Sequence, residues 1–431
     1  MGLQALRGTT DLLADAVARW SAVERTARRV ARLYGYREVR TPIIEDAALF
    51  LRSVGETSDI VQKEMFRFED RGGHDIVLRP EGTASVVRAY LEHHLDKTEG
   101  FAKLYYLGPM FRAERPQAGR FRQFHQYGVE AIGSSSPWVD VDVIMLCVQI
   151  LRACGVADSM VWLASMGCRD DQARSAAALR ERLAPHRSTL CKECQGRFDK
   201  NIFRVLDCKE PACRQVAWGS REPGSMASPF LLCESCAAHF DTVRRGLSAL
   251  GVPYDDTKVF ARGLDYYTRT VFEVRVQGLG AQDAVAAGGR YDHLVEELGG
   301  PAVGAVGFAA GIERLLMALD HARTESHEAP ARHGLYFAIA QPALTLDGMR
   351  WAQRLREQGV RALMDCDGKS LKAQLREADK AGCRLVAIFG DAEVTQRAMT
   401  VKDLERQGVQ RTIPFESFVD DVSRELVSPC R

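Results

Sequence analysis

The sequence predicts a protein of mixed α and β structure, in which an α+β domain is interrupted by a helical insertion and followed by a small α/β domain. Strand-like runs recur between helical stretches through the first three-quarters of the chain. Six of the twelve cysteines fall between residues 191 and 236, where the rest of the sequence has helical character. From residue 334 onward, apolar runs alternate with helical segments in the β-α-β-α order of an α/β domain.

The first part of the α+β domain covers residues 1–167 and begins with a helix. Apolar residues recur at helical spacing over 13–33, with arginines on the opposite face. A strand is expected at 38–45, where Pro42 favours an edge position. The other elements expected here are strands at 65–69 and 75–78 joined as a hairpin, strands at 104–107 and 124–132 around an arginine-rich loop, and a helix at 140–154.

Residues 168–250 are interpreted as an insertion, because they hold most of the cysteines and several helical stretches. The α+β domain resumes over 251–322. Strands are expected there at 257–277 and 284–288, followed by a glycine-rich run at 303–311 that leads into a helix.

A polar segment at 323–333 is predicted to be a linker. The final domain covers 334–431. Its expected strands lie at 335–340, 360–364 and 384–389, and its expected helices at 343–358 and 369–382.

Composition and charge exclude several classes of protein. The chain is 46% hydrophobic and 27% charged, as in ordinary globular proteins. Its net charge is +1, so any contact with nucleic acid must come from local patches. No segment approaches the roughly 20 uncharged apolar residues of a membrane span, and the N-terminus lacks an apolar signal core. We therefore expect a cytoplasmic protein without membrane contact.

The stretch 262–273 is the first candidate for a functional site. It contains two arginines, two carboxylates and the adjacent tyrosines Tyr266 and Tyr267. Buried charged groups are costly unless they are paired or face a ligand. The segment therefore indicates the wall of a pocket. The alternative is an amphipathic strand with a solvated face.

A second candidate is the segment 78–83, Leu-Arg-Pro-Glu-Gly-Thr, between a strand and a helix. Glu81 can hold an ammonium group, and Thr83 can add a hydroxyl contact. The alternative is the start of a helix, with a threonine cap and a glutamate in the first turn. Both interpretations can hold together.

The loop 112–122 contains four arginines within eleven residues. Arginine donors match phosphate oxygens, so the loop suits a nucleoside triphosphate or a nucleic-acid backbone. Aromatic residues such as Phe124 could stack on a base or anchor the strands. Gln126 and Glu130 lie four residues apart on the expected strand, so their side chains share a face and could enter one pocket.

Two glycine-rich motifs follow. The paired glycines within 286–292 permit close backbone approach to a ligand, and a tight turn is the alternative. The run 304–315 is interpreted as a buried strand, a turn and a helix, with Arg314 near the start of the helix where it suits a phosphate. The alternative is a surface arginine paired with Glu313 or Asp320.

Together these motifs resemble those of the class II aminoacyl-tRNA synthetases, and within that class the histidyl-tRNA synthetase family. The class motifs match at the helix and strand with Pro42, at the strands and loop from Phe111-Arg112 to Glu130, and at 307–314. The tighter, histidine-specific signatures are 262–273 and 287–292, with 78–83 and 122–126. The resemblance covers essentially the full length. It implies a mainly antiparallel catalytic sheet and a C-terminal anticodon-binding-type domain.

The resemblance implies a ligase reaction in two steps. Histidine and ATP form histidyl-adenylate and pyrophosphate, with Mg²⁺ as the expected cofactor. The histidyl group then moves to the 3′-terminal adenosine of tRNA(His).

The resemblance also implies a role for each matching residue. Histidine is expected to contact Glu81, Gly82, Thr83 and Gln126 at its α-amino end, Glu130 and Tyr267 at the imidazole nitrogens, and Tyr266 along the pocket. ATP is expected to contact Arg112 at the α-phosphate, Arg314 at the γ-phosphate, and Phe124. Arg262 is expected to bridge the histidine carboxylate and the α-phosphate, which makes Arg262 and Arg112 the expected catalytic residues.

Two kinds of partner are implied as well. Arg115, Gln117 and Arg120 are expected to meet the acceptor end of the tRNA. Residues 20–45 correspond to the dimer interface of this class, so the resemblance implies a homodimer.

The cysteines leave two interpretations open. Cys191 and Cys194, with Cys233 and Cys236, have the pair spacing of a zinc ribbon, although the gap between the pairs exceeds the usual one. Cys208 and Cys213 could replace or supplement them. The set indicates either a structural zinc site or free, partly buried thiols.

Two alternative functions fit the sequence less well. A histidine-sensing regulatory subunit of ATP phosphoribosyltransferase usually lacks the C-terminal domain, but here 334–431 is present and Arg262, Tyr266 and Tyr267 are intact. A non-catalytic nucleic-acid-binding protein that uses the cysteines is disfavoured by the near-neutral charge and by the arginines that suit ATP.

Overall fold

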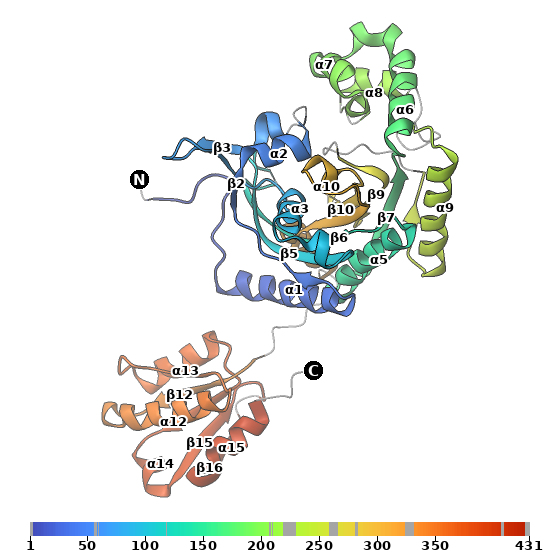
Figure 1. The fold of residues 1–431 in the computed structure, drawn as a ribbon. Helices are drawn as coiled ribbons and strands as arrows, with labels where there is room; N and C mark the ends of the chain where they lie inside the picture. Colours follow the sequence, from blue (N-terminus) through green and yellow to red (C-terminus); the bar gives the residue numbers. More distant parts are fainter. Residues whose placement is uncertain are drawn as a thin grey trace. The chain divides into compact units, whose positions relative to one another are not determined.

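The computed structural model describes residues 3–55, 58, 60–117, 119–206, 208, 210–218, 230–257, 266–280, 283–323, 332–406 and 409–426. The chain divides into two compact units, Met1–Glu325 and Ser326–Arg431 (Figure 1). The division falls within the segment 323–333 that the sequence predicts to be a linker. Most of that segment, 324–331, lies outside the described residues.

The first unit is built on a mainly antiparallel sheet, as predicted. Among the described residues it has eight strands in the order β1-β5-β6-β11-β10-β9-β7-β8. They are β1 (Arg37–Glu38), β5 (Ala102–Phe111), β6 (Gln123–Ile132), β7 (Met160–Ser165), β8 (Tyr254–Asp255), β9 (Thr268–Arg275), β10 (Ala284–Arg290) and β11 (Ala305–Gly311). Neighbouring strands pair antiparallel except β1 with β5 and β7 with β8.

Helices pack on both faces of this sheet. One face buries a large apolar cluster under α1 (Ala14–Leu33), α5 (Pro137–Cys154), α9 (Glu234–Ala249) and α11 (Ile312–Arg323). The other face packs against α3 (Thr83–Glu92) and α10 (Leu294–Glu297). Local sequence sets the bounds of α5: the Ser136 hydroxyl accepts a hydrogen bond from the Trp138 N–H, Pro137 starts the helix, and Gly155 ends it in a left-handed conformation.

A second, three-stranded sheet orders the segment before α3. Its strands are β2 (Ile44–Asp46), β3 (Phe66–Glu69) and β4 (Asp75–Leu78), with α2 (Ala47–Val54), η1 (Ile60–Glu64) and α4 (Leu95–Thr98) nearby in the chain. The predicted β3–β4 hairpin is confirmed. Beyond β4, the Arg79 guanidinium donates to the Pro109 and Thr41 carbonyls at 3.0 Å each. These bonds fix residues 80–83 against β5.

The insertion is helical, as predicted. It contains α6 (Arg169–Leu183), η2 (Ala184–Thr189), α7 (Lys192–Lys200), η3 (Ile202–Val205) and α8 (Pro211–Trp218) before α9. In the part that the structure describes, α6 to α8 share a small core of their own in which Cys194 and Cys213 are buried. Residues 219–229 lie outside the described residues.

The second unit has a five-stranded sheet in the order β13-β12-β14-β15-β16, counted over its described residues. Its elements are β12 (Leu335–Ile339), η5 (Pro342–Leu344), α12 (Thr345–Glu357), β13 (Ala362–Met364), α13 (Leu371–Lys380), β14 (Leu385–Phe389), α14 (Asp391–Gln396), β15 (Ala398–Asp403), β16 (Val409–Pro414) and α15 (Phe415–Leu426). The predicted β-α-β-α order is confirmed through β14, whereas β15, β16 and α15 were not expected. Across both units, no helix in the described residues has the length and apolar character needed to cross a membrane.

Candidate active site

The predicted ligand-binding motifs converge on one cavity of about 280 Å³ in the first unit. Strands β6, β9, β10 and β11, the start of α3 and the loop between β5 and β6 all contribute to its walls. The predicted residues that line it are Glu81, Thr83, Arg112, Arg120, Phe124, Gln126, Tyr266, Tyr267 and Arg314. The fold thus brings residues from distant parts of the chain into one site.

Glu81 organises the start of α3 on one wall of the cavity. Its carboxylate accepts hydrogen bonds from the backbone N–H groups of Thr83 and Ala84, at 2.7 and 2.8 Å. Glu81 therefore caps the helix, and the alternative of a threonine cap is wrong because Thr83 is already the first helical residue. Burial raises the pKa of Glu81, while the two backbone N–H groups oppose the rise.

Gln126 on β6 presents a buried acceptor to the same cavity. Its Oε1 atom has no hydrogen-bond partner among the described residues. A buried acceptor is costly unless a donor reaches it. Together, Glu81, Thr83 and Gln126 make an acceptor-rich corner that suits a ligand ammonium group.

Glu130 lies on the same face of β6 as Gln126, as its spacing predicts. One carboxylate oxygen accepts from the Thr83 hydroxyl at 2.7 Å, and the other accepts from the Tyr291 hydroxyl. Burial is complete, and it raises the pKa of Glu130 to about 8. The carboxylate therefore stands directly behind Thr83 and Tyr291, both of which line the cavity. No role was predicted for Tyr291, because nothing in its motif shows which carboxylate it meets.

Aromatic rings form the wall next to this carboxylate. Tyr266 and Tyr267 precede β9, and their ring centroids lie 4.9 Å apart. Tyr266 also meets Tyr291 edge to face, with centroids 5.7 Å apart. The predicted pocket wall is therefore confirmed for these tyrosines, which are buried rather than solvated.

Glycines make room for these side chains. A Cβ atom at Gly307 would lie 2.0 Å from the Glu130 Oε2 atom, and one at Gly289 would lie 2.9 Å from the Tyr267 ring. Gly289 lies inside strand β10, so the alternative of a tight turn there is wrong. Gly82 serves packing in the same way, since a Cβ atom there would lie 2.3 Å from the Tyr106 ring. These glycines let strands and rings approach one another closely.

Arginines gather at another part of the cavity. The Arg112 guanidinium donates to the Pro80 carbonyl at 3.0 Å and lies 5.3 Å from the centroid of the Phe124 ring. Arg314, near the start of α11, donates to the Gly119 and Ala284 carbonyls at 3.2 and 3.0 Å. Burial, together with the positive charge of Arg120, lowers the pKa of Arg314. Concentrated positive charge of this kind indicates an anion site.

Carboxylates complete this end of the cavity. Glu114 and Glu273 both line it, and neither received a role from the sequence. Glu114 pairs with Arg120 at 3.0 Å, and Glu273 accepts from the Arg275 Nε at 2.8 Å. Side chains alternate along β9, so Glu273 lies on the same face of the strand as Val271. That alternation is the sequence signal that could have placed Glu273 on the cavity side of the sheet.

The alternative interpretation of Arg314 as a surface arginine is wrong. Glu313 accepts hydrogen bonds from the His125 backbone N–H at 2.8 and 3.1 Å, and Asp320 pairs with Arg19. Arg314 is directed instead to the loop after β5 and to the start of β10.

The remaining predicted residues fall into two groups. Arg115 and Gln117 are exposed on the loop between β5 and β6, where a large partner can reach them. Arg262 and Asp265 lie outside the described residues. Arg269, the second arginine of the stretch 262–273, contacts Asp292 at 3.9 Å and the His239 ring at 3.4 Å.

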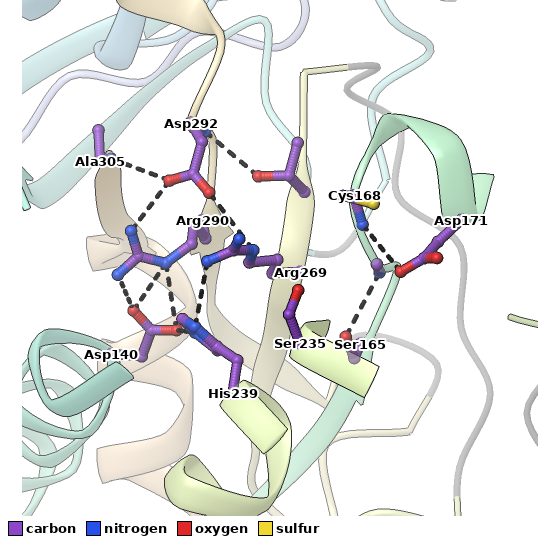
Figure 2. Close-up of polar contacts among 12 residues, drawn as sticks. Asp140, Ser165, Cys168, Asp171, Ser235, His239, Arg269, Arg290, Asp292 and Ala305 are labelled. Carbon is purple, nitrogen blue, oxygen red and sulfur yellow. Dashed lines mark hydrogen bonds and ion pairs between the residues drawn. The ribbon is translucent and has the colours of Figure 1, made fainter. Parts of the chain in front are cut away.

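A buried ionic network holds the end of β10 that leads to Tyr291 (Figure 2). Arg290 and Asp140, both fully buried, form an ion pair with an Nε–Oδ1 distance of 3.0 Å. Asp292 accepts from Arg290 at 2.9 Å, and the His239 ring lies 2.7 Å from Asp140. Although burial disfavours its charge, the bonds to His239 and Arg290 hold the pKa of Asp140 below its usual value. The network joins α5, α9 and β10.

Replacing Asp140 with alanine is expected to lower the free energy of unfolding of the first unit by about 3–5 kcal/mol, because Arg290 would stay buried without its counter-ion. Urea denaturation measures this change. The control is Asp241→Ala, which removes an exposed helical ion pair to Arg245 (3.1 Å) and is expected to cost less than about 1 kcal/mol. Equal losses in the two variants would contradict the assigned importance of the buried pair.

The cysteines form two groups, and the first agrees with the alternative in which Cys208 and Cys213 replace the second pair. Cys191 and Cys194 gather with Cys208 and Cys213, whereas Cys233 and Cys236 gather with Cys168 and Asp171. A single site made from Cys191, Cys194, Cys233 and Cys236 is therefore wrong. The sequence could not show this, because the helices between the pairs decide which thiols meet.

Comparisons with known proteins agree with this geometry. A family model described as histidyl-tRNA synthetase matches residues 8–192 and 236–315. A second model, described as an anticodon binding domain, matches residues 339–425.

Individual proteins resemble the chain over nearly its whole length. A histidine–tRNA ligase of Halothermothrix orenii is 43% identical over 98% of this chain and 100% of its own. One from Desulfitobacterium hafniense is 45% identical over 98% of both chains. The crystal structure of apo histidyl-tRNA synthetase from S. aureus superposes with a TM-score of 0.80 at 31% identity, covering 98% of this chain and 100% of that one. These similarities confirm the predicted architecture, including the C-terminal anticodon-binding-type domain.

Proposed function

This chain belongs to the histidyl-tRNA synthetase family, and from that premise we propose how its cavity works as a histidine–tRNA ligase. The enzyme activates histidine with ATP and transfers it to the 3′ end of tRNA(His). The observation that carries the proposal is that one cavity is lined by two sets of residues, the acceptors Glu81, Thr83 and Gln126 and the arginines Arg112, Arg120 and Arg314. The first suits the ammonium group of an amino acid, and the second suits the phosphates of ATP.

In the first step the histidine carboxylate attacks the α-phosphorus of ATP, and pyrophosphate leaves. Both reactants are anionic, so fixed positive charge must offset their repulsion. Arg112 is held by the Pro80 carbonyl and the Phe124 ring, which supports a fixed position at the α-phosphate. Arg314 is the proposed contact of the γ-phosphate. The family resemblance assigns the remaining bridge, between the carboxylate and the α-phosphate, to Arg262.

The carboxylate oxygens near the arginines are suitable ligands for Mg²⁺. This ion prefers one or two carboxylates together with substrate phosphates, and Glu114 and Glu273 line this end of the cavity. These two residues would hold it. Bound with ATP, Mg²⁺ would neutralise phosphate charge.

Histidine is selected, we infer, by the carboxylate and the tyrosines at the inner wall. Glu130 already accepts hydrogen bonds from Thr83 and Tyr291. An imidazole N–H would replace one of these hydroxyl donors, and Tyr267 would bond the other ring nitrogen. A site built to pair both nitrogens leaves its polar groups unsatisfied by phenylalanine or leucine, so it can discriminate by about 10⁴-fold without editing.

The exposed loop between β5 and β6 is the proposed contact for the acceptor end of the tRNA, through Arg115, Gln117 and Arg120. Arg115→Ala is expected to lower the slope of log affinity for tRNA against log salt concentration by about 0.7–1, because one phosphate contact is lost. Binding titrations at several salt concentrations measure the slope. Arg71→Ala, which removes an exposed arginine of the β3–β4 turn, is the control and should leave the slope unchanged. An unchanged slope in Arg115→Ala would remove this residue from the interface.

We also infer a homodimer in the cytoplasm, formed through residues 20–45. Support comes from exposed apolar side chains at Leu33, Ile43 and Ile44, which are 74%, 41% and 51% accessible. Exposed apolar side chains within a segment that the family resemblance assigns to the interface are consistent with an interaction surface. Light scattering at micromolar concentration would test the dimer, and a stable monomer would contradict it.

The complete function is tested by transfer of labelled histidine to tRNA by the purified full-length chain. Charging that requires ATP is the expected result. A histidine-sensing regulatory subunit, the alternative, would bind histidine without charging tRNA. That alternative is disfavoured by the match of 339–425 to an anticodon binding domain and by the arginines in the cavity.

A further inference from the structure

The insertion carries four cysteines whose sulfur atoms meet at one point, although they are spread over more than one element of the chain. Each Sγ atom lies within 4.8 Å of the other three. We propose that this cluster binds one structural Zn²⁺ through Cys191, Cys194, Cys208 and Cys213. No role in the ligase reaction is needed for it, since none of these residues lines the cavity.

The distances fit a single tetrahedral ion. Zn–S bonds of about 2.3 Å place the sulfurs of a tetrahedral site about 3.8 Å apart, and the Cys191–Cys208 Sγ distance is 3.9 Å. The same distance is far too long for a disulfide bond. A cluster with two irons would hold its two pairs of sulfurs farther apart than this compact set. The pair spacings, two residues between Cys191 and Cys194 and four between Cys208 and Cys213, are those of structural zinc sites.

Backbone N–H groups already point at two of the sulfurs. Cys191 N–H donates to the Cys213 Sγ at 3.1 Å, and Cys194 N–H donates to the Cys191 Sγ at 3.4 Å. Cys191 stands at the N-terminus of α7, where the helix dipole favours negative charge. Such donors stabilise thiolates, which are the form in which cysteine binds metal.

The location explains what the ion would do. It would join the start of α7, the segment after η3 and the first turn of α8. Cys194 and Cys213 are fully buried in the small core of the insertion. A core of this size needs an additional cross-link to hold one arrangement.

The second cysteine group provides a contrast. Its carboxylate, Asp171, already accepts hydrogen bonds from Arg174, from the Cys233 N–H at 3.0 Å and from the Cys168 N–H at 3.3 Å (Figure 2 shows the last). The Asp171 carboxylate therefore already has hydrogen-bond donors from the backbone of Cys168 and Cys233 and from the Arg174 side chain. We assign the metal to the first cluster only.

The test is elemental analysis of the full-length protein after addition of a molar excess of zinc and removal of loosely bound metal. The expected content is one zinc per chain in the wild type and in Cys233→Ser, and less than a tenth of that in Cys208→Ser. Cys208 is chosen because it is only partly buried. A wild-type content near zero, iron in place of zinc, or zinc retained in Cys208→Ser would overturn the site, and a content near two would overturn the restriction to one cluster.

Cobalt substitution keeps the test decisive if Cys208→Ser does not fold. The wild-type protein loaded with Co²⁺ is expected to show the intense ligand-field and thiolate charge-transfer bands of tetrahedral sulfur ligation, and Cys233→Ser should show the same spectrum. The weak bands of an octahedral oxygen site in the wild type would contradict the proposal.

Discussion

Replacing Arg112 with alanine is expected to lower kcat for histidine-dependent exchange of pyrophosphate into ATP by about 10²–10³-fold. This is the usual effect of removing one preorganised donor that stabilises charge in the transition state. Arg112 lines the cavity, and its Nε is held by the Pro80 carbonyl at 3.0 Å, so its remaining donors have a fixed direction. Steady-state exchange kinetics measure the change.

The same variant should bind histidine almost as well as the wild type does, because the acceptor-rich corner of Glu81, Thr83 and Gln126 remains intact. Calorimetric titration with histidine separates the two effects. Arg71→Ala, an exposed arginine outside the cavity, is the matched control and should retain full exchange activity. If Arg112→Ala kept its kcat, the α-phosphate would have to be assigned to another arginine.

Glu130→Gln is expected to stabilise the protein at pH 8 while it impairs the enzyme. Burial raises the pKa of Glu130 to about 8 from an ordinary value of 4.5. Because its pKa is raised in the folded state, Glu130 makes its full contribution to stability below pH 4.5, where it is protonated in both states. That contribution is lost as the pH rises toward 8, because the unfolded chain ionises first. Glutamine does not titrate, so the free energy of unfolding of the variant should exceed that of the wild type at pH 8 by about 2–4 kcal/mol.

Urea denaturation at pH 5 and pH 8 measures this difference, which should be small at the lower pH and large at the higher one. In the same variant, kcat/KM for histidine measured above pH 8, where Glu130 is mostly ionised, should fall by about 10- to 100-fold, since a hydrogen bond to a charged acceptor is lost. Glu69→Gln is the control, because Glu69 is exposed on β3 and its substitution should change neither quantity. If Glu130→Gln were less stable than the wild type at pH 8, the fold would stabilise the ionised form of Glu130, which would contradict the prediction.

Much of the site could be predicted because its residues lie in local patterns. The four-residue spacing of Gln126 and Glu130 placed them on one face of β6, and the short strand-like run at 75–78 predicted β4. The helical spacing at 13–33 predicted α1, which spans Ala14–Leu33. Each of these inferences depends on periodicity within one element.

The parts that could not be predicted depend on contacts between elements. The hydrogen bond from Tyr291 to Glu130 joins β6 to the segment after β10, and no spacing in the sequence relates them. The same holds for the thiols, because α7, η3 and the start of α8 lie between Cys191 and Cys213, and the packing of these elements brings the two thiols together. Strand β15 is different, because Met399 and Val401 alternate with polar residues in the sequence, and this local pattern is enough to indicate a half-buried strand.

The most direct test of the central claim is exchange of labelled pyrophosphate into ATP by the purified full-length protein, with and without histidine. The account predicts exchange that depends on histidine and falls to background when phenylalanine or leucine replaces it, because neither can pair the buried Glu130 and tyrosine hydroxyls. Absence of exchange with histidine, or equal exchange with phenylalanine, would contradict the account.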